Sequence, residues 1–398
     1  MTDIDAQKVE DDLLAPVYQK FPVDLFKGKD FTVWDKSGKE YLDFMGGYGV
    51  AIVGHCNPSV VNAIKEQASK LLICHGSMYN DARAIFLRKI LDVVPNQMGR
   101  VYMSNSGAEA VECALKVAKK YSGKKNIVAM TGSYHGKTFG ALSATWNPKY
   151  RDSFEPLLPG FSFVPYADIS ELEKIVTDKT GAVIIEPIQG ESGVLVPPEG
   201  YLREVRRICN DRGALLIFDE IQSGLGRSGR FWASEHSGVI PDIMCIAKGI
   251  AGGVPMGVTV ARDDIMASFK LGDHTSTVGG NPLACAAASA TLDFIVEEDL
   301  VNNAAKMGKL LSSGFSDMAK EHKIIRESRG HGLMLALELR FEVKPLLMDA
   351  LKKGLLLLYS GRNILRFLPP LTIGVAQVTR CLEILEEIIS AEEKARFK

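Results

Sequence analysis

Cysteine is sparse in this sequence and follows no pairing pattern. The seven cysteines are odd in number, form no C-x-x-C, and lie at Cys56, Cys74, Cys113, Cys209, Cys245, Cys285 and Cys381. Such spacing fits neither a disulfide framework nor a zinc site. The seven histidines add no H-E-x-x-H motif. We therefore expect a reduced, cytoplasmic chain that binds no metal.

Long apolar runs and an excess of one charge are lacking as well. The longest apolar stretches, such as GLLLLY at 354–359, are far shorter than the roughly 20 residues that span a bilayer. The amino-terminal stretch MTDIDAQKVEDDLLAP is acidic and lacks the basic start and apolar run of a signal peptide. The formal net charge is −1, so no basic field indicates nucleic acid. We predict neither a membrane nor a nucleic-acid partner.

What remains is the composition of a globular enzyme, with 46% hydrophobic and 24% charged residues in 398. This length suggests two or three domains. Short apolar runs alternate with helical patterns, and they are VYM, NIVAMT, AVIIEP, LLIFDE, IMCIAK and MGVTVA. Runs that are apolar on both faces and separated by helices are typical of a parallel sheet. The pattern predicts an α/β domain.

The flanking segments predict a second, smaller α+β domain built from both termini. FTVWDKSGKEYLDF at 31–44 predicts a hairpin, and Asn57 with Pro58 predicts the start of a helix. Further helices are predicted over 281–298, over 299–322 and from about 375, with short strands around HGLMLALEL and LRFLPP. We predict three segments: 1–55 in the small domain, 56–290 as the large domain, and 291–398 in the small domain.

Three of the apolar runs end in ionisable residues. Glu186 ends the first, Asp219 and Glu220 end the second, and Lys248 ends the third, at intervals of about 30 residues, the length of one strand-plus-helix unit. Ligands of parallel sheets bind outside the carboxyl ends of the strands. These residues therefore indicate one site. The alternative is an Asp219–Lys248 ion pair that only ties two strands together.

A lysine at a dry site loses its charge readily and becomes a nucleophile toward carbonyl groups. Pyridoxal 5′-phosphate is the cofactor aldehyde that forms a Schiff base with lysine, and its chemistry requires a carboxylate at the pyridinium nitrogen. Lys248 and Asp219 fit these two roles. The sequence thus predicts a pyridoxal-phosphate site.

The phosphate of such a cofactor needs an anion site. VYMSNSGAEAVECALKVAKKY at 101–121 predicts a strand, a turn and a helix, and Ser106 with Glu109 predicts a capping box. Gly107 and Ala108 would offer backbone N–H groups at the helix amino terminus, where an anion is favoured. In the alternative interpretation, Ser106 only caps its helix.

Two other glycine motifs fit nucleotide sites poorly. GSYHGKT at 132–138 is one residue short of a P-loop, and Thr131 stands where an earlier glycine is needed. GLGRSG at 224–229 matches G-x-G-x-x-G, but RFWASEHSG follows it where a helix should begin. A P-loop nucleotide hydrolase and a noncatalytic pyridoxal-phosphate binder stay as alternative classes.

Seven motifs taken together resemble a known family. They are, in order, SNSGAEAVE, YHGKT, EPIQGE, LLIFDEIQSGLGRSG, IAKGIAGGVPMG, STVGGNPLA and RFLPPL. From about residue 25 to 390 the sequence resembles class III pyridoxal-phosphate aminotransferases of the acetylornithine/ornithine group. The resemblance implies fold type I, with a mostly parallel seven-stranded sheet in a large domain, a small α+β domain from both termini, and a homodimer with shared active sites.

The resemblance also implies roles for the residues that match family motifs. Lys248 would be the Schiff-base lysine and Asp219 the pyridinium partner, the two catalytic residues. The other implied cofactor contacts are Gln222 near the phenolic oxygen, Tyr134 stacked on the ring with His135 beside it, Ser106, Gly107 and Ala108 at the phosphate, and Thr277 at the phosphate of the other subunit.

Five residues would bind substrate. Arg366 resembles the clamp for the α-carboxylate of glutamate and 2-oxoglutarate, and its planar fork suits that role. Glu191 resembles the carboxylate that pairs with this arginine when an ω-amino donor is bound. Ser276 would lie beside the substrate, and Tyr48 would meet the carboxylate of free ornithine or, alternatively, only pack at the rim. Lys137 stands where relatives usually have arginine, which keeps the charge and loses the fork.

Two segments resemble a particular branch of this group. GGYGVAIVGHCNP at 46–58 and TWNPKYRDSFEPL at 145–157 resemble enzymes that make lysine or ornithine on an amino-group carrier protein. We therefore predict transfer of the terminal amino group between carrier-linked lysine or ornithine (or its semialdehyde) and 2-oxoglutarate or glutamate, in lysine and/or arginine biosynthesis. The carrier would be an acidic partner protein. The alternative is an acetylornithine aminotransferase.

Overall fold

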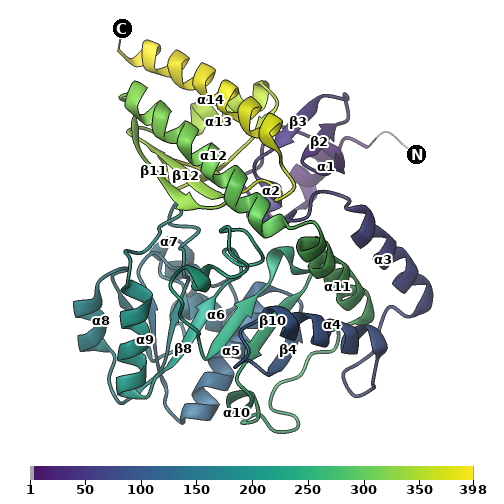
Figure 1. The fold of residues 1–398 in the computed structure, drawn as a ribbon, viewed down its shortest axis with the longest axis vertical. Coiled ribbons are helices and arrows are strands. Elements are labelled where there is room, and N and C mark those ends of the chain that lie inside the picture. The colour runs from purple at the N-terminus through teal and green to yellow at the C-terminus, as the bar shows by residue number, and fades with distance from the viewer. Residues whose placement is uncertain (1–3, 398) are drawn as a thin grey trace.

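The computed structural model describes residues 4–397, so the first three residues of the acidic amino-terminal stretch and Lys398 lie outside the described residues. A seven-stranded sheet forms the centre of the lower part of the molecule (Figure 1). Its strands, in spatial order, are β4 (Arg100–Ser104), β10 (Gly257–Ala261), β9 (Ile243–Ile246), β8 (Leu215–Asp219), β7 (Thr180–Ile185), β5 (Asn126–Met130) and β6 (Phe161–Val164). Only β10 runs antiparallel to its neighbours, so the prediction of a mostly parallel sheet is confirmed.

Successive residues of the central strands enter two different cores, one on each face of the sheet. Ile184 and Ile217 join the core beneath α5 (Gly107–Ser122), whereas Val183 and Leu216 join the core beneath α9 (Tyr201–Arg212). This alternation is the two-residue period of a strand. It explains why these runs are apolar throughout, because both faces are covered.

Several helices around this sheet begin at capping side chains, of which the sequence predicts Asn57 and Ser106. Asn57 caps α3 (Pro58–Lys70), Ser106 caps α5, and Asn281 caps α11 (Pro282–Glu297). The shorter and outer elements are α4 (Asp81–Val93), α6 (Phe139–Ala144), α7 (Pro148–Arg151), η1 (Asp152–Phe154), α8 (Ile169–Ile175), η2 (Ala233–His236), η3 (Lys248–Ala251) and α10 (Asp263–Met266). In the part of the chain from residue 4 to 397, no helix is both long and apolar enough to cross a membrane.

Segments from both ends of the chain form the upper part of the molecule, where purple and yellow ribbons lie together in Figure 1. One sheet joins β1 (Leu25–Lys29), β2 (Thr32–Asp35), β3 (Glu40–Asp43) and β13 (Leu355–Leu356), and β3 pairs with β13 in parallel. A second, antiparallel sheet has the order β11 (Ile325–His331), β12 (Met334–Leu339), β15 (Ile364–Phe367) and β14 (Leu358–Ser360). The remaining helices are α1 (Ala6–Leu13), α2 (Gly46–Gly49), α12 (Leu300–Glu321), α13 (Lys344–Lys352) and α14 (Val375–Arg396). The segment boundaries after residues 55 and 290 stay predictions.

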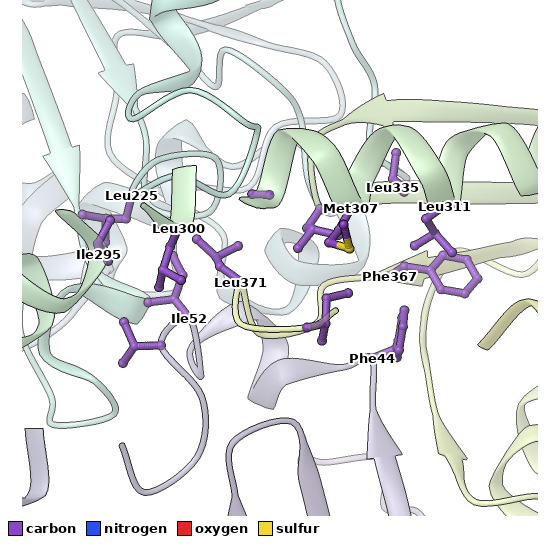
Figure 2. Packing of buried hydrophobic residues seen from close by; sticks show 14 of the residues in the cluster. Phe44, Ile52, Leu225, Ile295, Leu300, Met307, Leu311, Leu335, Phe367 and Leu371 are labelled. Atoms are coloured by element: carbon purple, nitrogen blue, oxygen red, sulfur yellow. The ribbon is translucent and has the colours of Figure 1, made fainter. Parts of the chain in front are cut away.

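One hydrophobic core runs between the two parts of the molecule. Figure 2 shows Ile295 and Leu300 at the junction of α11 and α12, followed by Met307 and Leu311 further along α12. Phe367 of β15 lies against this helix and meets Phe44 edge-on, with ring centroids 6.5 Å apart. The upper and lower parts therefore share buried surface, which holds the strand ends of the sheet in a defined position relative to the small sheets.

A buried histidine clasps α12 to α14 and leads to a stability prediction. His322 Nδ1 lies 2.8 Å from Glu393 Oε2, and its Nε2 lies 3.0 Å from Glu386 Oε1. Both ring nitrogens must donate, so the imidazole has to be protonated. Burial acts to lower the pKa of His322, but the hydrogen bonds to the two glutamates outweigh it and the pKa is raised.

The contribution of this clasp is complete below the unfolded pKa of about 6.5 and is lost as pH rises through the higher folded value. We expect His322→Gln to lower the free energy of unfolding by about 1–2 kcal/mol at pH 6 and by much less at pH 9. Urea unfolding of both proteins at the two pH values measures this. His75→Gln, in an exposed loop where His75 bonds only Ser77, is the control. An equal loss at both pH values would contradict the clasp.

Candidate active site

The strands β7, β8 and β9 are neighbours, so their carboxyl ends bring Glu186, Asp219 and Lys248 to one edge of the sheet. Glu186 and Asp219 are 5% and 4% exposed. Glu220 instead turns away and accepts hydrogen bonds from Ser223 Oγ and from the backbone at residues 233 and 234. The predicted meeting of three strand ends is therefore observed, without Glu220.

Lys248 is the first residue of η3 and has a left-handed backbone, with φ of 47°. That conformation costs a non-glycine residue about 1–3 kcal/mol and occurs mostly at functional sites. Burial lowers the pKa of Lys248, while the carboxylates of Glu191 and Asp219 act in the opposite direction. The amine thus loses its proton more readily than an exposed lysine, as a nucleophile toward carbonyl groups must.

Asp219 is held by a histidine rather than by the lysine. Its Oδ2 lies 2.7 Å from Nδ1 of His135, and its Oδ1 accepts a hydrogen bond of 3.1 Å from the backbone N–H of Ile221. The alternative of an Asp219–Lys248 ion pair is therefore wrong for this structure. His135 is buried, and its Nε2 has no hydrogen-bond partner among the described residues. Asp219 is thus a buried carboxylate of fixed orientation, with its Oδ2 bonded to His135.

The amino terminus of α5 packs directly beside Lys248. A Cβ on Gly107 would lie 2.9 Å from Ile221 Cδ1 and 3.5 Å from Ala247 Cβ, so glycine permits this close approach. Ser106 Oγ accepts a hydrogen bond from the N–H of Glu109, as predicted. The reciprocal bond differs, because the Glu109 carboxylate accepts from the N–H of Asn105 and not of Ser106.

The loop between β5 and α6 carries Tyr134 and His135 over the same region. A Cβ on Gly136 would lie 2.7 Å from the Cβ of Ala108, which shows that this loop packs on the start of α5. Ser276 is brought to the same place, since its Oγ lies 3.4 Å from Asn105 Nδ2. Thr277, the next residue, is exposed on the chain's surface.

Glu186 has a positioning role that the sequence interpretation missed. Its two carboxylate oxygens accept hydrogen bonds from the backbone N–H of Tyr134, at 3.0 Å, and of Gly190, at 3.1 Å. Burial raises the pKa of Glu186 to about 7. This one side chain thus joins the loop that carries Tyr134 to the loop that carries Glu191. The sequence feature that could have indicated this role is the position of Glu186 in EPIQGE, directly after a buried strand.

The buried Arg366 and the partly exposed Glu191 form an ion pair in the site. Arg366 is 1% exposed, and its Nη1 donates to Glu191 Oε1 at 2.9 Å and to the carbonyl oxygen of Gly190 at 2.9 Å. Burial acts to raise the pKa of Glu191, but the charges of Arg366 and Lys248 outweigh it, so the pKa is lowered. The Nε of Arg366 has no partner among the described residues. The guanidinium can therefore bind a further carboxylate.

Aromatic residues line the outer part of the site. Tyr134 and Tyr150 meet edge to face with centroids 5.6 Å apart, and the Lys137 ammonium lies 5.0 Å from the centroid of Tyr150. Tyr48 is half-exposed. Partial burial raises its pKa, the charge of Arg366 acts to lower it, and the charge of Glu191 acts to raise it. Tyr150 is a further residue that the sequence interpretation missed, because it follows no catalytic motif.

These groups fit pyridoxal 5′-phosphate. Lys248 has the lowered pKa that covalent attachment of an aldehyde needs, and Asp219 supplies the buried carboxylate. The buried Gln222 Oε1, without a partner among the described residues, lies beside Gly190, where even a Cβ would be 2.0 Å away. A lysine and a carboxylate placed in this way at a mostly parallel seven-stranded sheet define a pyridoxal-phosphate-dependent enzyme of fold type I.

Comparison with known proteins specifies the family. Residues 13–389 match the aminotransferase class-III family, and the chain belongs to it. Acetylornithine aminotransferase of Methanopyrus kandleri is 44% identical over 390 residues, which cover 98% of this chain and 100% of that protein. Acetylornithine aminotransferase of Methanosarcina mazei is 44% identical over 371 residues, 93% of this chain and 92% of its own.

Solved structures agree in fold. The ornithine aminotransferase of Toxoplasma gondii superposes with a TM-score of 0.94 at 33% identity, covering 98% of this chain and 95% of its own. Acetylornithine aminotransferase of Elizabethkingia anophelis superposes with a TM-score of 0.87 at 34% identity, covering 97% of this chain and 98% of its own. The chain is a pyridoxal-phosphate-dependent aminotransferase.

Proposed function

We propose that the enzyme transfers the terminal amino group of N-acetylornithine to 2-oxoglutarate, forming glutamate. The observation that carries this proposal is the ion pair between Arg366 and Glu191, 2.9 Å apart. Arg366 can bind the carboxylate of a substrate or, when that is absent, the carboxylate of Glu191. Such an arrangement suits an enzyme that alternates between two kinds of amino donor. The relatives named acetylornithine aminotransferase support this substrate over the carrier-linked one predicted from the sequence.

Each residue of the site then has a task. When bound, pyridoxal 5′-phosphate supplies the carbonyl that takes up the amino group and a ring that accepts electrons from the broken C–H bond. Lys248 would hold the cofactor, and its uncharged amine would take the proton from the substrate carbon and deliver it to the carbon through which the amino group is carried. Asp219 would keep a proton on the ring nitrogen, and His135 fixes the orientation of this carboxylate.

Arg366 and Glu191 separate the two half-reactions. With glutamate, Arg366 holds the α-carboxylate and Glu191 gives up its place. With an ω-amino donor, whose carboxylate lies far from Lys248, Glu191 stays paired, so the buried guanidinium is never left without a counter-charge. The donor's own carboxylate then lies toward Tyr48 and Lys137 at the outer part of the site.

Arg366→Lys tests this division. Lysine keeps the charge and loses the fork, so we expect the KM for glutamate and 2-oxoglutarate to rise about 10–100-fold. The half-reaction with acetylornithine should change far less. Single-turnover kinetics with each donor measures both. Arg362→Lys, in the exposed turn that joins β14 to β15, is the control. An equal loss in both half-reactions of Arg366→Lys would refute the division.

A carrier-linked donor is the second candidate. It is favoured by one observation: the two segments that resemble the carrier-linked branch, 46–58 and 145–157, contribute Tyr48 and Tyr150 to the outer part of the site. In the proposed binding mode, the end of the donor that does not react lies in this outer part. A donor attached to a protein would leave the site past these two residues.

A comparison of donors separates the candidates. We expect kcat/KM for N-acetylornithine to exceed that for free ornithine or lysine by about tenfold or more, because a site shaped for an amide disfavours a charged amine. It should also equal or exceed kcat/KM for the carrier-linked donor and be insensitive to salt. A carrier-linked donor that is preferred, with kcat/KM falling as ionic strength rises, would move the assignment to the second candidate.

We also propose that the enzyme is a homodimer with shared active sites. Thr277 and Val278 are exposed on the loop that carries Ser276, and Tyr79 and Leu271 are fully exposed large apolar residues. Contiguous exposed apolar side chains mark an interaction surface, and we infer that these residues belong to one. A second copy that covers them would bring Thr277 to the cofactor phosphate of its partner.

A further inference from the structure

A pocket of about 500 Å³ lies apart from the active site, and none of the site residues described above lines it. Three segments form its wall. They are the loop from Ser228 to His236, the middle of α12, and the turn between β11 and β12. The first belongs to the chain that follows β8, whereas the other two belong to the upper part of the molecule (Figure 1).

Glycines let these segments approach closely. A Cβ on Gly308 of α12 would lie 2.0 Å from the carbonyl oxygen of Gly332, and a Cβ on Gly332 would lie 2.4 Å from the nitrogen of Gly229. Hydrogen bonds tie the same segments together, since the N–H of Leu333 donates to the carbonyl of Arg227 at 3.0 Å and Arg227 Nη1 donates to the carbonyl of Leu333 at 3.1 Å. The pocket is therefore a fixed feature of the fold.

The lining is basic. Arg230 and Lys309 contribute guanidinium and ammonium groups, and neither makes an ion pair with any residue between 4 and 397. His236 and His331 stack with ring centroids 4.7 Å apart at 21°. Among the described residues that line the pocket there is no aspartate or glutamate. Ser228 adds a hydroxyl, 3.3 Å from Nε2 of His236.

We propose that this pocket binds a small oxyanion with at least two negative charges, a phosphate compound or a polycarboxylate. Its volume is that of a small-molecule site. Two cations from different segments converge on it without a counter-charge, and an anion between them gains charge-assisted hydrogen bonds from both. The His331 imidazole and the Ser228 hydroxyl supply further donors, whereas Nε2 of His236 donates to the carbonyl oxygen of Ser228 at 3.1 Å. The bound anion would join the loop after β8 to α12 and the β11–β12 turn.

Calorimetric titration of the cofactor-loaded enzyme with pyrophosphate, and separately with citrate, tests this at constant ionic strength. Loading the cofactor keeps its own phosphate site filled. We expect one anion per chain, bound at least tenfold more weakly by the double variant Arg230→Ala/Lys309→Ala. Lys306→Ala, which removes an exposed charge from the same helix outside the pocket, should stay within twofold of the wild type.

The two titrants distinguish the possible sources of the anion. Preferred pyrophosphate indicates a phosphate compound, and preferred citrate indicates a polycarboxylate; either supports the site. Both substituted side chains are exposed, so the double variant should fold, which its unchanged transaminase activity would verify. In the wild type alone the melting temperature should rise with the anion. Absence of binding, or equal binding by the double variant, would overturn the proposal.

Discussion

Lys248→Ala is expected to abolish transamination, with kcat falling by about 10⁴-fold or more. In the proposed mechanism the same amine holds the cofactor and moves the proton, so no other group would replace it. The fold should persist, because alanine at this left-handed position is no more strained than lysine and its introduction removes no hydrogen bond of the described structure. Stopped-flow absorbance with glutamate and with N-acetylornithine, together with the melting temperature, measures both effects.

Borohydride reduction supplies the control for this variant. In the wild type the cofactor should be fixed to the peptide that contains Lys248, and Lys137→Ala should leave that label in place. A label on Lys137 or on any other lysine would refute the assignment. Such a label would refute the assignment whatever the activity of the variant, since the label reports only where the cofactor is attached.

The inactive variant also tests the proposed dimer. Mixed subunits of Lys248→Ala and Thr277→Ala should form heterodimers in which one site has both residues intact. Activity should recover toward half of the wild-type value per heterodimer. No recovery after subunit exchange, verified by mass spectrometry, would show that Thr277 serves only its own chain or no site at all.

Asp219→Asn is expected to lower kcat by about 10²–10³-fold, the loss typical of one well-placed electrostatic group. Asparagine has the same shape and can still bond to His135, but it carries no charge to hold a proton on the ring nitrogen. Cofactor binding should largely survive, because Lys248 still holds it. Absorbance of the bound cofactor and single-turnover rates with each donor measure the two properties separately.

Glu220→Gln is the matched control for this variant. Glu220 is adjacent and equally buried, but its carboxylate serves the loop at residues 233–234 and not the site. Its substitution should reduce the free energy of unfolding and leave kcat within a few-fold of the wild type. Near-normal catalysis by Asp219→Asn, or an equal loss in both variants, would mean that the pyridinium nitrogen has another partner.

The sequence could predict the sheet because burial on both faces leaves a strong pattern. Six of the seven strands were expected, and β6 was missed because Phe161–Val164 is a short edge strand with only Val164 buried. The three strand ends could be predicted to meet because the carboxyl ends of neighbouring parallel strands lie on one edge. The pyridinium role was predicted for Asp219 and not for Glu220, and in the structure the two carboxylates indeed bond to different parts of the chain, because neighbouring strand residues point to opposite faces.

Loop residues were the harder part of the site. Tyr150 lies in the short helix α7, and its approach to Tyr134 and Lys137 depends on how the 131–158 segment folds back. The role of Glu186 depends on two backbone N–H groups, and no residue type in the sequence encodes a backbone donor. The partner of Asp219 was likewise invisible, because His135 and Asp219 are brought together only by tertiary structure.

The parallel pairing of β3 with β13 has a consequence for synthesis of the chain. Leu42 pairs with Leu355, so about 310 residues must follow before the amino-terminal hairpin can gain its last neighbour. At about 5–20 residues per second on the ribosome, this delay is roughly 15–60 s. Val33 and Tyr41, which are buried against Leu351 and Leu356 in the finished protein, stay uncovered on that side throughout. The nascent hairpin therefore exposes apolar surface during most of translation.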